Sequence, residues 1–287
     1  MVRWCLKAKK AGTHAHTNVW AAAFFVPRSY CAHFWRTWIS ERGTALCLPL
    51  STPNRLIAGE TFPKANSAPM RNCWRRIWRP KTSHDAQYVV IVDRNPFVQM
   101  AMIYWMSTDG EFHFIGASPV STGKPGRFEH FLTPTGVFEH TIDNSDFFAE
   151  GTRNEFGIRG YGRAGMRVYD FGWRTAEKGW GAGGEGTLRL QMHATDPDLL
   201  EKELGTPQSK GCIRIPATLN TFIDHYGILD GDYEKAMTEG MTFWVLSKTR
   251  EATPWSGRFL VVVDTGRSKR PTWARPEKPM PQSRGRL

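Results

Sequence analysis

The sequence lacks any apolar run of roughly 18–20 residues, the length that a membrane-spanning helix needs. The longest apolar run near its start, residues 19–26, follows Lys7, Lys9 and Lys10, which is the order found in a secretion signal. That run is short, however, and no small-residue cleavage site follows it. The sequence therefore predicts no membrane span, and an export signal is not clearly visible.

Acidic residues are nearly absent from the first 84 positions, which hold 14 Lys and Arg but only two Asp and Glu. Residues 85–265 carry a net charge of −7, and residues 266–287 carry +6. The total of +11 therefore comes from the two ends, and no nucleic-acid-binding motif accompanies it, so no specific nucleic-acid partner is expected. These shifts predict a basic, Trp- and Arg-rich extension (1–84), a folded domain (85–265) and a basic, Pro-rich tail (266–287). We interpret the extension as poorly ordered, with a basic-aromatic arm for an anionic polymer as the alternative.

Cysteine is scarce in the predicted domain, where Cys212 stands alone. The other four cysteines lie in the extension, at spacings that match no zinc-binding pattern, and their pairing cannot be deduced: Cys5, Cys31, Cys47 and Cys73. A lone thiol in a long domain is either a small buried filler or a reactive group.

Residues 85–265 have the pattern of a mainly β domain. Short β-branched and aromatic runs between Gly-, Asp- and Pro-containing turns predict strands at 88–92, 98–106, 112–120, 136–142, 166–171, 187–193, 241–246 and 259–264. An Asp196–Pro197 start predicts a helix that ends at Gly205, and apolar residues at helical spacing predict a second helix from Pro216 to Gly227. The expected fold is a β-sandwich or barrel-like core with a few short helices.

Between the two predicted helices lies the segment Ser209-Lys210-Gly211-Cys212-Ile213-Arg214, and His193 ends a predicted strand upstream. A strand can hold an imidazole rigidly while a loop brings a thiol to it, and a nearby imidazolium favours the nucleophilic thiolate. Amides around Gly211 and Cys212 could form an oxyanion hole, and Arg214 offers a planar fork for a carboxylate.

This arrangement resembles the L,D-transpeptidase (YkuD-type) catalytic domain, whose signature is a His, a variable gap and then Ser/Thr-His-Gly-Cys with a following basic or amide residue. Two further segments, Ser121–Lys124 and Thr133–Phe138, resemble the hairpin that precedes the active site in that family, and the strand and turn at 89–95 are also similar. The resemblance covers about residues 87–264. It departs from the family at Lys210, where the motif has His, and at Ala194, so that another group, such as a backbone carbonyl, must orient His193.

The resemblance implies that Cys212 is the nucleophile, His193 its general base, Ser209 a support of the loop and Gly211 part of the oxyanion hole. Arg214 would orient the loop or the substrate, and Lys210 and Tyr161 are further candidates for substrate binding. Tyr161, Tyr169, Phe171 and Trp173 are interpreted as the lining of a substrate groove or as ordinary packing, whereas His113, His130 and His140 are interpreted as sheet-surface residues.

Enzymes of this family transfer an acyl group between peptidoglycan stem peptides, or to a lipoprotein, through a thioester and without metal or organic cofactor. The resemblance thus implies peptidoglycan partners and a location in the periplasm or cell envelope. Two alternatives stay open: hydrolysis of such links by an L,D-carboxypeptidase, and a non-catalytic module that binds the cell wall.

Overall fold

A computed structural model describes residues 85–274 of the 287-residue chain. The predictions for residues 1–84, including the four cysteines there, and for residues 275–287 of the tail lie outside the described residues. The elements are β1 (Gln87–Asp93), β2 (Met100–Met106), β3 (Phe112–Pro119), β4 (Gly136–Glu139), β5 (Phe147–Phe148), β6 (Arg167–Glu177), β7 (Glu185–Ala194), a 3₁₀ turn (Glu201–Glu203), β8 (Ile213–Ile215), α3 (Ala217–His225), α4 (Gly231–Thr238) and β9 (Phe259–Val263).

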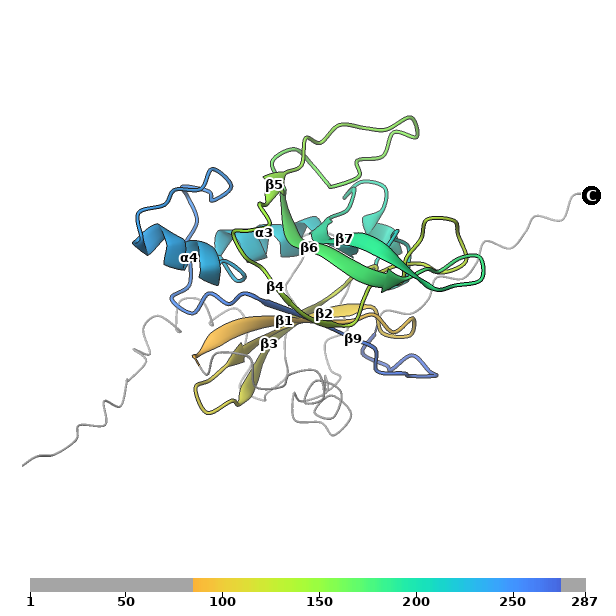
Figure 1. The fold of residues 1–287 in the computed structure, drawn as a ribbon, viewed down its shortest axis with the longest axis horizontal. Coiled ribbons are helices and arrows are strands. Elements are labelled where there is room, and N and C mark those ends of the chain that lie inside the picture. Colours follow the sequence, from red (N-terminus) through yellow and green to blue (C-terminus); the bar gives the residue numbers. More distant parts are fainter. Residues whose placement is uncertain (1–84, 275–287) are drawn as a thin grey trace, which may run out of the picture. The chain divides into compact units, whose positions relative to one another are not determined.

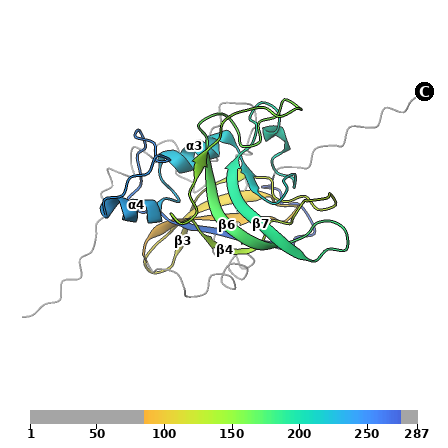
Figure 2. The ribbon, with the colours of Figure 1, turned by 45° about the horizontal axis from the view of Figure 1, so that its top comes forward.

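The strands form two sheets, and the predicted mainly β class is confirmed. The first sheet has the order β3-β2-β1-β9-β4, and the second has the order β5-β6-β7-β8. Figure 1 shows the long β6–β7 hairpin beside the first sheet, and Figure 2, turned by 45°, shows the hairpin running across the first sheet's strands. No helix in the described part of the chain has the length and apolar character needed to cross a membrane.

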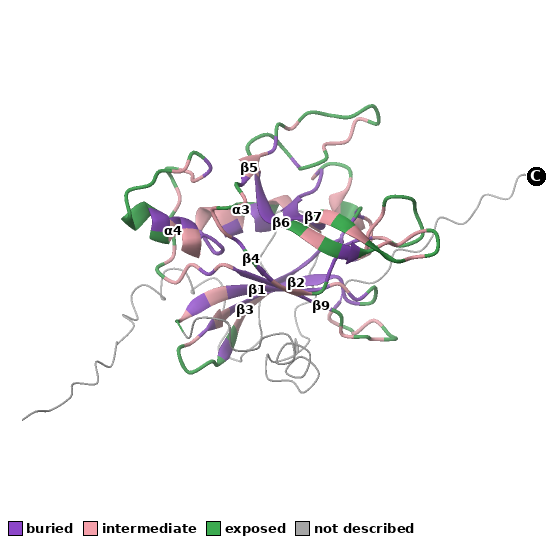
Figure 3. Ribbon diagram, in the orientation of Figure 1, coloured by how far each residue is buried: buried purple, intermediate pink, exposed green. Residues whose placement is uncertain are grey.

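One apolar core joins the two sheets and α3. It contains alternate residues of β1 and β9, the inward-facing residues of β6, β7 and β8, and two residues of α3: Val90, Val92, Leu260, Val262, Tyr169, Phe171, Leu190, Met192, Ile213, Ile215, Leu219 and Ile223. The opposite face of the first sheet is buried as well, through residues such as Val89, Ile91 and Val261. Burial on both faces explains why β1 and β9 are continuous β-branched runs rather than alternating ones, and Figure 3 shows both as buried.

Most predicted elements are present, but two predicted elements are wrong, and β5, β8 and α4 were not predicted. Asp196 does cap a turn, because its Oδ1 accepts the amides of Asp198 and Leu199, but only the 3₁₀ turn 201–203 follows instead of a helix. The chain leaves the turn there because Leu204 is buried and the Gly205 amide donates to the Val120 carbonyl.

The predicted strand 241–246 is wrong, and helix α4 was not predicted. Residues 241–246 run without a partner strand, and their rings pack on other elements: Phe243 on Tyr233 and Trp244 on Phe148, with centroids 4.8 Å and 5.4 Å apart. A sequence pattern cannot distinguish aromatic residues that pack in this way from those of a strand.

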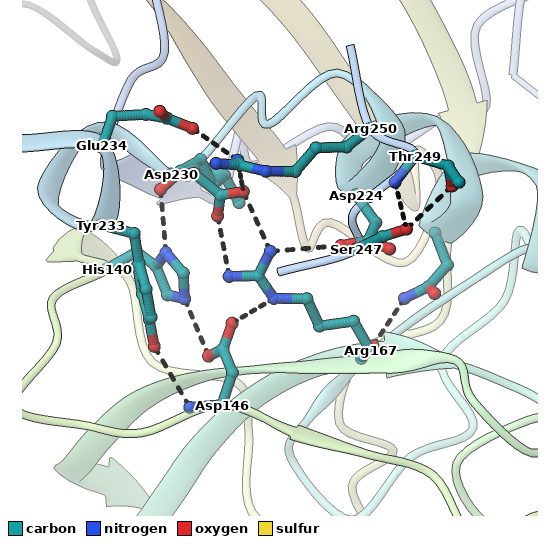
Figure 4. A network of polar contacts seen from close by, with 12 residues as sticks. His140, Asp146, Arg167, Asp224, Asp230, Tyr233, Glu234, Ser247, Thr249 and Arg250 are labelled. Carbon is teal, nitrogen blue, oxygen red and sulfur yellow. Dashed lines mark hydrogen bonds and ion pairs between the residues drawn. The ribbon is translucent and has the colours of Figure 1, made fainter. Parts of the chain in front are cut away.

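A buried ionic network surrounds Arg167, whose side chain is fully enclosed (Figure 4). Its guanidinium lies 2.6 Å from Asp146, 2.8 Å from Asp230 and 3.2 Å from Asp224. These carboxylates come from the segment before β5, from α3 and from the start of α4, so the network connects the second sheet to both helices.

His140 belongs to this network, so its interpretation as a sheet-surface residue is wrong; the same interpretation is correct for the exposed His113 of β3. Its Nδ1 lies 2.8 Å from the Leu229 carbonyl and its Nε2 2.8 Å from Asp146. Burial opposes a charge on the ring, but Asp146 outweighs this effect and raises the pKa of His140. Both ring nitrogens face acceptors, which favours the doubly protonated form.

We expect Asp146→Asn to lower the free energy of unfolding by about 3–5 kcal/mol, because it leaves Arg167 and His140 as buried charges without this partner. Urea denaturation at neutral pH measures the change. The control is Glu129→Gln, which breaks the exposed Lys210–Glu129 pair and should leave the urea midpoint nearly unchanged. Equal losses of unfolding free energy in the two variants would contradict a stabilising role of the buried network.

Candidate active site

The candidate site lies on the face of the second sheet that points away from the shared core. In β7, Leu190, Met192 and Ala194 are core residues on one face, so Gln191 and His193 lie on the other. Strand β8 runs parallel to β7 and places Arg214 directly beside His193. Cys212 precedes Arg214 by two positions, directly before β8, so the alternation of the strand places the thiol, the imidazole and the guanidinium on one face.

The loop that carries Cys212 is held by hydroxyl groups. Ser209 Oγ accepts the Gly211 amide at 3.0 Å and donates to the Cys212 carbonyl at 2.5 Å. Thr133 Oγ1 donates to the Gly211 carbonyl at 2.7 Å and accepts the Gly123 amide at 2.9 Å. The segments 121–124 and 133–138 that were matched to the family hairpin thus supply groups that contact this loop.

Gly211 adopts a conformation that other residues rarely accept. Its φ is +131°, and a Cβ at this position would lie 2.8 Å from a methyl carbon of Leu188. Because the Gly211 amide donates to Ser209, an oxyanion hole at this site depends on the Cys212 amide rather than on both amides.

The Cys212 thiol is half-buried, and its Sγ lies 3.8 Å from the Arg189 carbonyl. Burial raises the pKa of the Cys212 thiol, and the negative charge of Asp170 adds to this effect. The Gln191 amide and the positive charge of Arg214 act in the opposite direction. The protonated thiol is therefore the resting form at neutral pH.

His193 is buried, and its Nδ1 lies 2.7 Å from the Ala194 carbonyl. Since a carbonyl oxygen only accepts, Nδ1 carries the proton and Nε2 keeps its lone pair. The sequence analysis expected a group such as a backbone carbonyl to orient His193, because Ala194 offers no polar side chain. The Ala194 carbonyl is that group. Burial is the main cause that lowers the pKa of His193 to about 4; the positive charge of Arg214 contributes, and the hydrogen bond to the Ala194 carbonyl opposes it. The ring is therefore neutral at neutral pH.

These two pKa shifts correct one expectation. The sequence suggested an imidazolium that stabilises a thiolate, but burial disfavours both charges here. The arrangement instead suits a neutral imidazole that accepts the thiol proton during attack on a substrate.

The other predicted site residues lie around this pair. The Tyr161 ring packs edge-on against His193 with centroids 4.7 Å apart, and its hydroxyl lies 3.3 Å from Gln191 Oε1. Lys210 is exposed and pairs with Glu129 at 3.2 Å. Of the aromatic candidates for a substrate groove, Tyr169 and Phe171 belong to the core, whereas Tyr161 and Trp173 reach the surface.

His130 is a half-buried loop residue beside the Cys212 loop, so its interpretation as a sheet-surface residue is wrong. Burial lowers its pKa, although a hydrogen bond with the Ser209 backbone opposes this effect. The positive charge of Lys210 also disfavours a charged His130 ring.

Sequence reasoning missed Asp170, which is fully buried in β6 and pairs with Gln191 of β7. Its carboxylate accepts Arg189 Nε at 2.7 Å, Gln191 Nε2 at 3.0 Å and the Gly172 amide at 2.8 Å. Nothing in the sequence marks this Asp as part of a site, because the pairing of β6 with β7 alone determines that Arg189 and Gln191 are its hydrogen-bond partners.

No group of three or more His, Cys, Asp or Glu within residues 85–274 is arranged to hold a metal ion. Comparison of the sequence with models of protein families finds no matching family, and comparison with curated proteins finds no matching relative.

We expect iodoacetamide to alkylate Cys212 about tenfold faster for each pH unit between pH 6 and 8, because burial keeps the pKa of the thiol above this range. Mass spectrometry of the peptide that contains Cys212 reports its alkylation separately from that of the other cysteines. Cys212→Ser is the control, and it should leave that peptide unmodified. A rate that stays constant from pH 6 to 8 would instead indicate a stable imidazolium–thiolate pair.

Proposed function

We propose that the protein is a peptidoglycan L,D-transpeptidase that acts through a Cys212 thioester. The observation that carries the proposal is the placement of a half-buried thiol and a neutral, oriented imidazole on one face of the second sheet. The resemblance of residues 87–264 to the YkuD-type domain supports the choice of substrate.

In the proposed first step, Sγ of Cys212 attacks the carbonyl carbon between the third residue of a stem peptide, a diamino acid, and its terminal D-alanine. Nε2 of His193 accepts the thiol proton, and the Cys212 amide stabilises the negative charge on the carbonyl oxygen. The bond to the D-alanine nitrogen then breaks, and His193 returns the proton to that nitrogen. D-Alanine leaves and the acyl group remains as a thioester.

In the second step, an amine of another stem peptide or of a lipoprotein attacks the thioester carbon. His193 removes a proton from this amine and passes it to the departing Sγ, so an amide forms and the thiol is restored. Attack by water instead would make the enzyme an L,D-carboxypeptidase. Because the substrate is cell-wall material, we place the reaction in the periplasm or cell envelope.

We expect Cys212→Ala to abolish acylation by a carbapenem, since no other group would form the adduct. His193→Ala should slow the acylation at neutral pH by about 10²–10⁴-fold, the usual contribution of a positioned base. Intact-protein mass spectrometry over time measures both. The control is His113→Ala, which removes an exposed imidazole of β3 and should acylate at the wild-type rate. A Cys212→Ala protein that still gains the adduct mass would exclude Cys212 as the nucleophile.

Incubation with tetrapeptide muropeptides, followed by chromatography and mass spectrometry, distinguishes transfer from hydrolysis. We expect cross-linked dimers together with released D-alanine, and none of either with Cys212→Ala. Tripeptide products without dimers would replace the transpeptidase by a carboxypeptidase, and the absence of turnover would refute both.

A further inference from the structure

An arginine and a tryptophan lie opposite each other on the site face of the β6–β7 hairpin. Arg189 of β7 pairs directly with Trp173 of β6, and the guanidinium carbon lies 5.9 Å from the indole ring centroid. Both side chains are open to solvent, with 44% of the Arg189 side chain and 64% of Trp173 exposed.

A β-bulge produces this pairing. Asp170 pairs with Gln191, but two residues, Phe171 and Gly172, then occupy the place of one before Trp173 pairs with Arg189. Gly172 has φ +78°, and a Cβ there would lie 2.7 Å from Asn144 Oδ1. The bulge returns Trp173 to the same face as Asp170, as bulges near active sites commonly do.

The carboxylate of Asp170 orients the arginine from the neighbouring strand β6. Its Oδ2 binds Arg189 Nε at 2.7 Å, and it is fully buried while the arginine is not. A guanidinium has five N–H donors, and within residues 85–274 the hydrogen bonds of Arg189 use only Nε. The terminal nitrogens are therefore available to a planar anion, whereas the enclosed Asp170 is shielded from a cationic ligand.

The backbone of this arginine is adjacent to the thiol, because the carbonyl of Arg189 lies 3.8 Å from Cys212 Sγ. Its side chain extends toward β6, where Asp170 and Trp173 lie. Gln191, two positions along the same face, also binds Asp170 and lies close to the hydroxyl of Tyr161. Contacts on this face therefore run from Arg189 through Asp170 and Gln191 to Tyr161, whose ring packs on His193.

We propose that Arg189, backed by Asp170 and flanked by the indole of Trp173, forms a carboxylate-binding subsite beside Cys212 that receives a carboxylate of the acyl-donor peptide. The guanidinium binds the carboxylate, and the indole covers the short apolar part of the residue that bears it. Only the identity of the donor rests on the proposed function; the anion site next to the thiol does not.

The test compares alkylation of Cys212 by iodoacetate, an anion, with alkylation by neutral iodoacetamide, followed on the Cys212 peptide. The ratio of the two rates cancels any change in the thiolate fraction. We expect Arg189→Gln to lower this ratio roughly tenfold, since a charge-assisted contact to the anionic reagent is lost. An unchanged ratio would overturn the proposal.

Arg258→Gln is a matched control on the other sheet. Arg258 also lies beside a carboxylate, that of Glu139, at 3.7 Å, and its guanidinium carbon lies 5.3 Å from the ring centroid of Phe259. It should keep the wild-type ratio. Arg214→Gln is measured in parallel, and a charge preference lost in this variant but kept in Arg189→Gln would also overturn the proposal.

A second measurement needs no variant, in case Arg189→Gln does not fold. N-Acetyl-D-alanine should slow the iodoacetamide reaction of the wild-type chain, whereas its carboxamide should not. Equal effects of the two compounds would count against the subsite. Neither measurement requires acyl transfer. The subsite can therefore be confirmed when the muropeptide assay shows no turnover, and it can be refuted when that assay shows cross-linking.

Discussion

Enclosure of the Arg167 guanidinium is the constraint on which the second sheet depends. A buried cation is tolerated only when carboxylates surround it, and here Asp146, Asp224 and Asp230 come from three different parts of the chain. The start of β6 therefore takes its place only when the segment before β5, α3 and the start of α4 are all correctly placed. Arg250 extends the same network by pairing with Asp230 and Glu234.

The network continues to the site through one carboxylate. Asp146 binds Arg167 with Oδ2, and its Oδ1 accepts the amide of Asp170 at 2.9 Å. Asp170 in turn binds Arg189 and Gln191, whose backbone groups contact the Cys212 thiol. A series of contacts thus links the buried arginine to the Cys212 thiol through Asp146, Asp170 and the backbone of β7.

Burial also determines the chemistry that the site can perform. It raises the pKa of Cys212 and lowers that of His193, so the two groups rest in their neutral forms. In the proposed reaction, charge develops only when a substrate is attacked, next to the backbone amide of Cys212 and the positive charge of Arg214. A protonated thiol reacts more slowly with alkylating agents and oxidants than a permanent thiolate does.

The sequence by itself determined the mainly β class, most strands and helix α3, and it selected Cys212 and His193 as candidate site residues. Short-range signals carry each of these results: β-branched runs, helical spacing and a compact motif around one thiol. It could not reveal Asp170, the Gly172 bulge or the Arg189–Trp173 pair, and it misjudged His140 and the protonation of the Cys–His pair. Those features follow from the register of β6 against β7 and from the depth of burial. Only the tertiary structure decided them, because it alone sets which distant groups meet and how much water reaches each charge.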